Sequence, residues 1–108
     1  MKVVKVEDKP MTIFFDELNQ ENKRVRMGLI RLEPGEKIPA EGYSRHEQDE
    51  FSYVIKGRCH TILEDGQDIL AVPGDAQLIE ANEGHINYNS SDEVAEVVWM
   101  LVEREENK

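Results

Sequence analysis

The sequence predicts an all-β protein, built as a sandwich or a barrel. Short runs of β-branched and aromatic residues are separated by turn-forming residues such as Gly66 and Gly74. These turn signals recur about every 8–12 residues, a spacing typical of that class. No stretch shows the periodicity of an amphipathic helix of three turns. The 108 residues suffice for one domain with one hydrophobic core.

The N-terminal strands are expected within residues 1–33. A short β-branched run precedes Pro10, and a second short run follows it. A polar segment then indicates a loop or one helical turn, and a loosely alternating run ends at the turn Pro34-Gly35. The expected strands are residues 2–6, 11–15 and 25–32, with the loop at residues 16–23.

The strongest strand is expected at residues 51–55, which are aromatic and β-branched and are followed by Gly57. A loop at residues 39–50 leads into it. The sequence Glu64-Asp65-Gly66 is typical of a hairpin turn, and Pro73-Gly74 closes the next strand. The remaining expected strands are residues 58–63, 68–72, 76–79, 85–88 and 94–102, with the last reaching to about residue 103 and a charged tail that frays to residue 108.

Charge and cysteine usage narrow the class of protein. The net charge of −10 would repel a nucleic-acid backbone, so we expect no nucleic-acid partner. Cys59 is the single cysteine, so no intrachain disulfide forms and nothing indicates an oxidising compartment. Residues 1–10 lack the apolar region of a signal peptide, and the longest apolar run, residues 97–102, is too short to span a bilayer. A cytoplasmic protein without a membrane partner is expected.

The strand around residue 50 has two chemically distinct faces. Because side chains alternate along a strand, residues at even separations share a face. The polar face comprises His46, Gln48, Glu50, Ser52 and Val54, and the apolar face comprises Phe51, Tyr53 and Ile55. We expect the polar face to line the interior, and the apolar face to be covered by another strand layer or by a second subunit.

His46 and Glu50, together with His85, could hold a divalent metal. Two imidazoles and one carboxylate bind a metal on one side and leave coordination positions open. That facial arrangement suits Fe(II) and is compatible with Zn, Mn or Ni. The spacing alone equally fits a solvated junction between a loop and a strand, so both interpretations stay open at this point.

Two segments carry a resemblance to a known family. Residues 35–57 resemble the first cupin motif, a glycine, His-x-His, three or four residues, a glutamate, six residues and a glycine. Here His46 stands at the second histidine, three residues separate it from Glu50, and six more lead to Gly57. Residues 74–89 resemble the second motif, in which His85 follows Gly74 by eleven residues and Asn89 comes after three more.

The resemblance implies a double-stranded β-helix, or jelly-roll, barrel of the cupin type spanning residues 1–108. It also implies metal ligands at His46, Glu50 and His85. The chain departs from the motifs, because Ser44 occupies the first histidine position and Glu80 and Asn82 replace a proline and a glycine. Two alternatives follow: a three-ligand metal site with extra room for substrate or water, or a metal-free pocket that binds an organic ligand directly.

Ser44, Gln48 and Glu80 are the further pocket candidates. Glu41 or Gln48 could supply a missing oxygen ligand, and Glu80 is either a second acid beside the site or a solvated loop charge. Tyr43 and Tyr88 either line the pocket or pack outside it. The remaining notable side chains are expected to be structural: His60 as a half-exposed strand residue, Cys59, Trp99 and Met100 as core or interface residues, and Asn89 as a partner for turn backbone.

The fold supports several functions, because this scaffold hosts many activities. The first hypothesis is a metal-dependent oxygenase or isomerase acting on a small molecule, with its catalytic residues unknown. The alternative is a non-catalytic ligand-binding or sensing module, since residues 49–55 resemble the ligand-sensing domains attached to transcription regulators. The apolar strand face and residues 2–6 further predict a homodimer.

Overall fold

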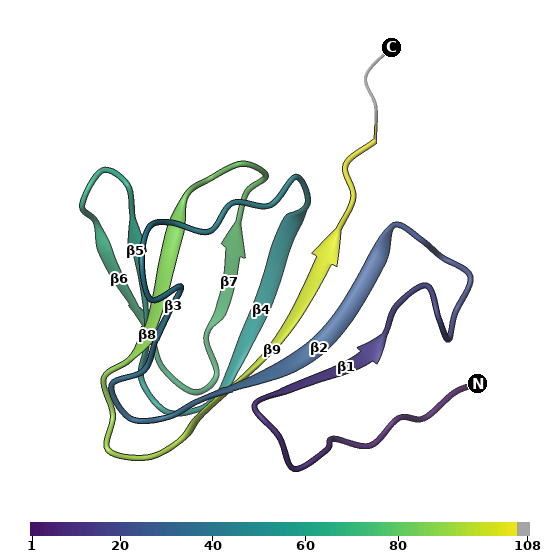
Figure 1. The fold of residues 1–108 in the computed structure, drawn as a ribbon, viewed down its shortest axis with the longest axis horizontal. Coiled ribbons are helices and arrows are strands. Elements are labelled where there is room, and N and C mark those ends of the chain that lie inside the picture. The colour runs from purple at the N-terminus through teal and green to yellow at the C-terminus, as the bar shows by residue number, and fades with distance from the viewer. Residues whose placement is uncertain (106–108) are drawn as a thin grey trace.

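The computed structural model describes residues 1–105, which form nine β-strands and no helix (Figure 1). No helix among these residues is long and apolar enough to cross a membrane. The strands are β1 (Met11–Phe15), β2 (Val25–Leu32), β3 (Lys37–Ile38), β4 (Asp49–Lys56), β5 (Cys59–Leu63), β6 (Asp68–Ala71), β7 (Ala76–Ile79), β8 (His85–Asn89) and β9 (Ala95–Val102).

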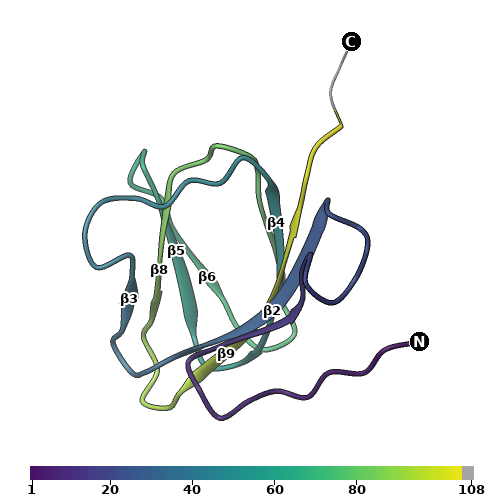
Figure 2. The ribbon, with the colours of Figure 1, turned by 45° about the vertical axis from the view of Figure 1, so that its right-hand side comes forward.

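The strands build two antiparallel sheets that face each other (Figures 1 and 2). The larger sheet has the order β1-β2-β9-β4-β7, and the smaller has the order β3-β8-β5-β6. Sequence neighbours such as β4 and β5 lie in different sheets, which is the crossing pattern of a jelly roll. The predicted all-β jelly-roll class is therefore confirmed. Among the described residues no strand pair joins the two sheets, so the predicted barrel is an open sandwich rather than a closed cylinder.

The hydrophobic core lies at the end of the sandwich where β4 ends and β9 begins. Its buried members are Leu32, Val54, Cys59, Ala71, Ala95 and Val97. Gly57 makes the turn from β4 to β5 with a φ of 93°, and a Cβ at that position would lie 2.5 Å from the Cβ of Ala95. Glycine is therefore required both by the backbone conformation and by the close approach of β9.

The N-terminal segment is a correction to the sequence-based expectation. Residues 2–6 are β-branched, yet they form no strand and pair with no sheet edge within the described chain. Val3 is exposed, and the Lys2 ammonium group donates a hydrogen bond to the Asn19 carbonyl oxygen. β-propensity describes how a side chain fits a sheet that already exists, so it cannot create a strand without a partner edge.

The other expected elements agree closely with the structure. Each predicted strand from residue 11 onward occurs with its ends shifted by two residues or fewer, and residues 16–23 form the expected loop. Strand β3 was not predicted, because two residues carry no recognisable pattern; it exists through its pairing with β8. The predicted fraying of the C-terminal tail concerns in part residues 106–108, which lie outside the described residues.

Candidate metal centre and ligand cavity

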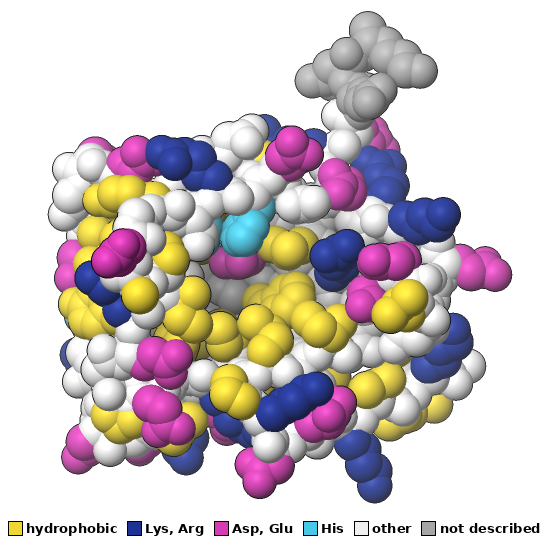
Figure 3. Space-filling model, viewed as in Figure 1, with side chains coloured by type: hydrophobic (Ala, Val, Ile, Leu, Met, Phe, Trp, Pro, Cys, Tyr) yellow, Lys and Arg dark blue, Asp and Glu magenta, His cyan; other side chains and the backbone are white. Residues whose placement is uncertain are grey.

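A cavity of about 300 Å³ lies between the two sheets. Figure 3 shows it as a hollow in the surface, with a histidine at its edge and mostly apolar side chains around it. The apolar lining comprises Met11, Ile13, Ile30, Leu32, Ile38, Ile79, Val97, Trp99 and Leu101. The remaining lining residues are Ser44, His46, Glu50, Ser52, Cys59, Gln77, His85 and Asn87.

Strand β4 presents its polar side chains to this cavity. Glu50 and Ser52 line the cavity and Val54 is fully buried, whereas Phe51, Tyr53 and Ile55 between them are exposed on the outer face. The alternation predicted from the sequence is therefore confirmed from residue 50 to residue 55. This alternation directs the Glu50 carboxylate into the space between the two sheets. Pairing with β7 on one side and β9 on the other fixes the orientation of β4.

Gln48 does not follow this alternation and is not a cavity residue. Its side-chain amide donates a hydrogen bond to the Glu103 carboxylate, with an N–O distance of 2.7 Å. Strand β4 begins only at Asp49, so the loop before it does not obey the strand periodicity. His46 reaches the cavity from that same loop, whose backbone is held by a 2.6 Å hydrogen bond from the Asn82 N–H to the His46 carbonyl oxygen.

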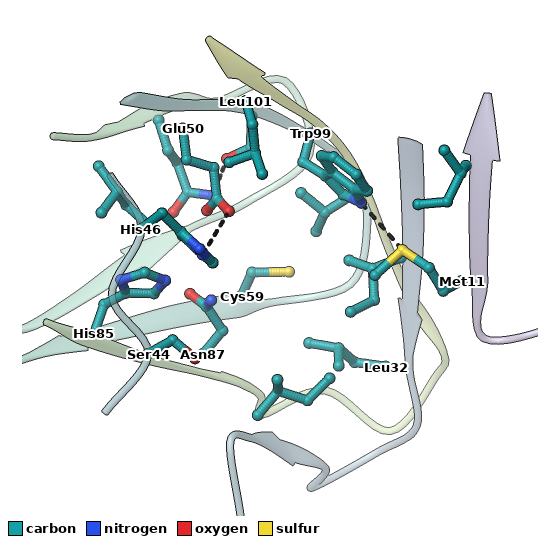
Figure 4. Close-up of a pocket in the computed structure, with 17 residues that line it drawn as sticks. Met11, Leu32, Ser44, His46, Glu50, Cys59, His85, Asn87, Trp99 and Leu101 are labelled. Carbon is teal, nitrogen blue, oxygen red and sulfur yellow. Dashed lines mark hydrogen bonds and ion pairs between the residues drawn. The ribbon is translucent and has the colours of Figure 1, made fainter. Parts of the chain in front are cut away.

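His46, Glu50 and His85 come together at one end of the cavity (Figure 4). One ligand atom from each of the three lies within 4.8 Å of the other two. His46 Nε2 is 3.6 Å from Glu50 Oε1, and the two imidazole rings are 5.4 Å apart between centroids, with planes inclined by 51°. The rings are thus arranged around a common point and are not stacked on each other.

His85 is the most buried member of this group. It is only 1% exposed and lies at the start of β8. Its Nδ1 is 3.0 Å from the Glu83 carbonyl oxygen, which can only accept, so Nδ1 carries the proton in the neutral ring. The lone pair of the neutral imidazole is then on Nε2, where it is available to a ligand or a metal.

Ser44 is joined to His85 by backbone hydrogen bonds. The Ser44 N–H donates to the His85 carbonyl oxygen at 2.9 Å, and the His85 N–H donates back at 3.0 Å. Ser44 also lines the cavity. The position where the first motif would have a histidine is therefore inside the cavity and next to a candidate ligand, but it carries only a neutral hydroxyl.

Several cavity residues were missed or given a different role by sequence reasoning. Cys59, Gln77 and Asn87 were not predicted to line a cavity, and Trp99 was interpreted as packing. Asn87 lies two residues after His85 on the same strand, so strand parity could have identified it. Burial raises the pKa of the Cys59 thiol, which keeps that side chain neutral.

Four other candidates lie outside the cavity. Glu80 is exposed, with its carboxylate 4.0 Å from the Arg104 guanidinium, and neither Glu41 nor Tyr43 lines the cavity. Glu80 belongs to the loop after β7, beyond the last inward position, Ile79. Tyr88 is on the outer face of β8, because β8 turns alternate residues such as Asn87 inward.

His60 and Asn89 have the structural roles that were expected. The His60 ring stacks on Tyr88 at 4.3 Å on the outer face, with Nδ1 2.8 Å from Asp68 and Nε2 2.7 Å from the Ser90 hydroxyl. Asn89 is fully buried, and its amide group donates to the carbonyl oxygens of Leu32, at the end of β2, and Glu93, in the loop before β9, at 3.0 and 2.7 Å. Asn89 therefore connects segments of the fold and does not face the cavity.

Two facing antiparallel sheets with a histidine–carboxylate cluster in the space between them define a jelly-roll protein with an internal ligand cavity. Residues 28–101 match the family model described as the cupin domain, which is more than half of the chain. The chain belongs to the cupin family. No curated protein sequence matches it.

Solved structures from several organisms share this fold. An RmlC-like cupin family protein with a double-stranded β-helix fold from Methanocaldococcus jannaschii is 18% identical, with a TM-score of 0.78 over 95% of this chain and 91% of that one. A predicted oxalate decarboxylase from Thermotoga maritima is 21% identical, with a TM-score of 0.73 over 87% and 79%. A sugar phosphate isomerase of the cupin superfamily from Silicibacter pomeroyi is 26% identical, with a TM-score of 0.67 over 88% of this chain and 60% of that one.

Proposed function

We propose that this cupin binds a divalent transition metal, Fe, Mn, Zn or Ni, through His46, Glu50 and His85, and that it binds a small molecule in the cavity next to that metal. The observation that carries the proposal is the convergence of three ligand-type atoms within 4.8 Å of one another at the polar end of the cavity. The proposed activity is that of a metal-dependent enzyme, an oxygenase or an isomerase.

The donor set fits such a metal. Two ligands about 2.1 Å from one ion, at angles between octahedral and tetrahedral, are roughly 3.0–3.4 Å apart. The 3.6 Å separation of His46 Nε2 and Glu50 Oε1 needs only a small side-chain adjustment to reach that range. The Glu83 carbonyl oxygen already holds His85 in the tautomer that a metal requires, which is the usual supporting contact of a histidine ligand.

The residues around the cluster suit a bound small molecule. A metal with open positions would polarise a carbonyl group or activate water or dioxygen. Asn87 presents its side-chain amide to the same space and Ser44 its hydroxyl, so both could orient a ligand by hydrogen bonds. The names of two proteins with this fold, a predicted oxalate decarboxylase and a sugar phosphate isomerase, agree with small-molecule chemistry on this scaffold.

The test is metal content followed by metal titration. Protein purified without chelators is examined by elemental analysis, and metal-free protein is titrated with Zn²⁺ and Mn²⁺ by calorimetry and thermal denaturation. His46→Ala and Glu50→Gln should each weaken binding by more than about 100-fold, since a lost ligand costs more than a lost supporting contact. The matched control is His60→Ala, which removes a histidine on the outer face. If no transition metal co-purifies and none raises the melting temperature, the proposal is wrong.

The second candidate is a non-catalytic, metal-free binding or sensing pocket. Ser44 favours it, because a neutral hydroxyl beside His85 is a poor ligand for such metals. In this case His46 and Glu50 would contact an organic ligand directly. A thermal-shift screen of small molecules on wild type and His46→Ala, both without metal, distinguishes the two functions. Ligand binding by the metal-free wild type supports the metal-free pocket, and weaker binding by His46→Ala assigns a direct contact to His46.

The proposal includes a homodimer in the cytoplasm, where a lone thiol such as Cys59 stays reduced. Its support is the outer face of the larger sheet, where Phe51 is paired across the strands with Leu78 and Met100. All three are exposed, as is the neighbouring Tyr53. Contiguous exposed apolar side chains of this kind mark an interaction surface, and a second copy of the chain would cover them.

A further inference from the structure

We propose that the ligand of this cavity is an elongated, mostly apolar molecule with one chelating, oxygen-rich end and without a second anionic group. Its chelating end would meet the metal at His46, Glu50 and His85, so this part of the inference rests on the proposed function. Its apolar body would lie against the wall built by β1, β2 and β9. The inference excludes phosphorylated sugars as preferred ligands.

The charge of the cavity lining limits the class of ligand that can bind. Among residues 1–105, no lysine or arginine lines the cavity. Arg26 shares the inner face of β2 with Ile30, but it lies outside the lining, with its guanidinium 3.3 Å from the Glu17 carboxylate. A buried anion needs a cation or a dense set of hydrogen-bond donors to offset its lost hydration. An anionic group on the ligand would find that partner only at a metal held by the histidine cluster.

The distribution of polar side chains in the cavity also limits the class of ligand. The histidine and carboxylate side chains gather at one end of the cavity, and Figure 4 shows Trp99, Met11 and Leu32 at the other end. Ser52, which is paired with Trp99 across the strands, contributes a neutral hydroxyl to the lining. Some of the polar groups are already engaged: the Asn87 carbonyl oxygen accepts from Thr61 at 2.9 Å, and the Gln77 amide donates to Ser52 at 3.1 Å. A polyol would turn hydroxyl groups toward a wall that cannot replace their hydrogen bonds to water.

Trp99 makes this wall a flat apolar surface. Its indole N–H donates to the Met11 sulfur at 3.3 Å and is therefore not offered to a ligand. A Cβ at Gly28, the residue paired with Trp99 on β2, would overlap the indole ring. Gly28 thus lets the ring lie against β2, where its face is available to an apolar or aromatic ligand body.

The experiment uses two hydroxamic acids that share one chelating head. Octanohydroxamic acid carries six more methylene groups than acetohydroxamic acid, and each buried methylene favours binding. Both are titrated into Zn²⁺-loaded protein, with calorimetry and the fluorescence of Trp99, the single tryptophan, as readouts. We expect octanohydroxamic acid to bind at least about tenfold more tightly, and glucose 6-phosphate to bind more weakly than either. Equal affinity for the two hydroxamic acids, or tighter binding of glucose 6-phosphate, overturns the inference.

Two matched variants identify where the tail binds. Ile30→Gln places an amide in the apolar wall, on the residue that is paired with Met11, whereas Leu70→Gln introduces an amide on the exposed outer face of β6. Ile30→Gln should weaken octanohydroxamic acid at least about tenfold and leave acetohydroxamic acid unchanged, and Leu70→Gln should change neither. A tail effect that is insensitive to Ile30→Gln contradicts the inference.

Failure of the metal site and failure of the ligand class give different results. Titration with Zn²⁺ alone tests the metal site. If Zn²⁺ does not bind, the proposed function is wrong, and the two hydroxamic acids are compared on the metal-free protein. Tail-dependent binding that Ile30→Gln removes then still supports the apolar ligand class, and tail-independent binding or no binding overturns it.

Discussion

Ser44 and His85 are joined by two reciprocal backbone hydrogen bonds of 2.9 and 3.0 Å, so the first and second motifs meet directly at the cavity. Because Ser44 lines the cavity beside a candidate ligand, Ser44→His should add a third imidazole, and thus a fourth ligand, to the cluster. We expect its affinity for Zn²⁺ to rise at least about tenfold, within the range that contacts around a metal contribute. Calorimetric titration of metal-free protein measures this.

Ser44→Ala is the matched control for that gain. It removes the hydroxyl without adding a ligand and should leave the affinity for Zn²⁺ unchanged. A Ser44→His protein that binds Zn²⁺ no better than wild type would show that this side chain does not reach the point shared by His46 and Glu50.

Gly28→Ala should destabilise the fold, because the added Cβ would overlap the Trp99 ring and lie 2.6 Å from the Thr12 carbonyl oxygen. Overpacking of this kind costs about 1–3 kcal/mol of unfolding free energy. Urea denaturation followed by Trp99 fluorescence measures the change, and a shifted emission maximum of the folded protein is expected as well. Gly35→Ala is the comparison: nothing lies within 4 Å of its added Cβ, so only the left-handed backbone, with φ at 78°, opposes it, at about 1 kcal/mol. Equal stability of Gly28→Ala and wild type would contradict the contact.

The contact between Tyr88 and Asp68 predicts a pH dependence at alkaline pH. The Tyr88 hydroxyl donates to Asp68 at 2.9 Å, and this hydrogen bond raises the pKa of Tyr88 above its usual 10.0. Since the folded pKa is the higher one, the stabilisation is complete below pH 10 and is lost as the pH rises through the folded pKa. Ultraviolet titration should show one late-ionising tyrosine, and Tyr88→Phe should remove it.

The same contact predicts a pH dependence of stability at acid pH, through the carboxyl group of Asp68. Hydrogen bonds from His60 and then from Tyr88 lower the pKa of Asp68 below its usual 3.8. A lowered folded pKa gives stabilisation that is present above the usual value and is lost as the pH falls through the folded value. Asp68→Asn should therefore weaken the pH dependence of the melting temperature at both extremes. If the Asp68→Asn profile matches that of wild type, the contact does not contribute.

The outer face of the larger sheet predicts a dimer. Tyr53 and Phe51 are exposed there beside Leu78, and a charged side chain at the centre would be desolvated on association. We expect wild type to sediment as a dimer at micromolar concentration and Tyr53→Lys to sediment as a monomer with an unchanged circular dichroism spectrum. Leu70→Lys, on the other sheet, is the control and should remain dimeric. A monomeric wild type would refute the homodimer.

The features that depend on neighbouring residues could be predicted from the amino-acid sequence. Turn glycines and β-branched runs located the strands from residue 11 onward, because strand ends follow local conformational preference. Strand parity oriented Glu50 and Ser52 inward, and the spacing of the two motifs identified His46 and His85 as a pair. Each of these inferences needs only a few consecutive residues or a known motif.

The pairing of the strands and the content of the cavity follow only from the folded chain. Gln48 lies outside because the strand begins one residue after it, and residues 2–6 have no strand partner among residues 1–105. The apolar wall around Trp99 joins the consecutive strands β1 and β2 to β9, which is distant from them in the sequence. No local pattern encodes such a wall, because it arises only when β9 inserts between β2 and β4 and turns its inner face toward the second sheet.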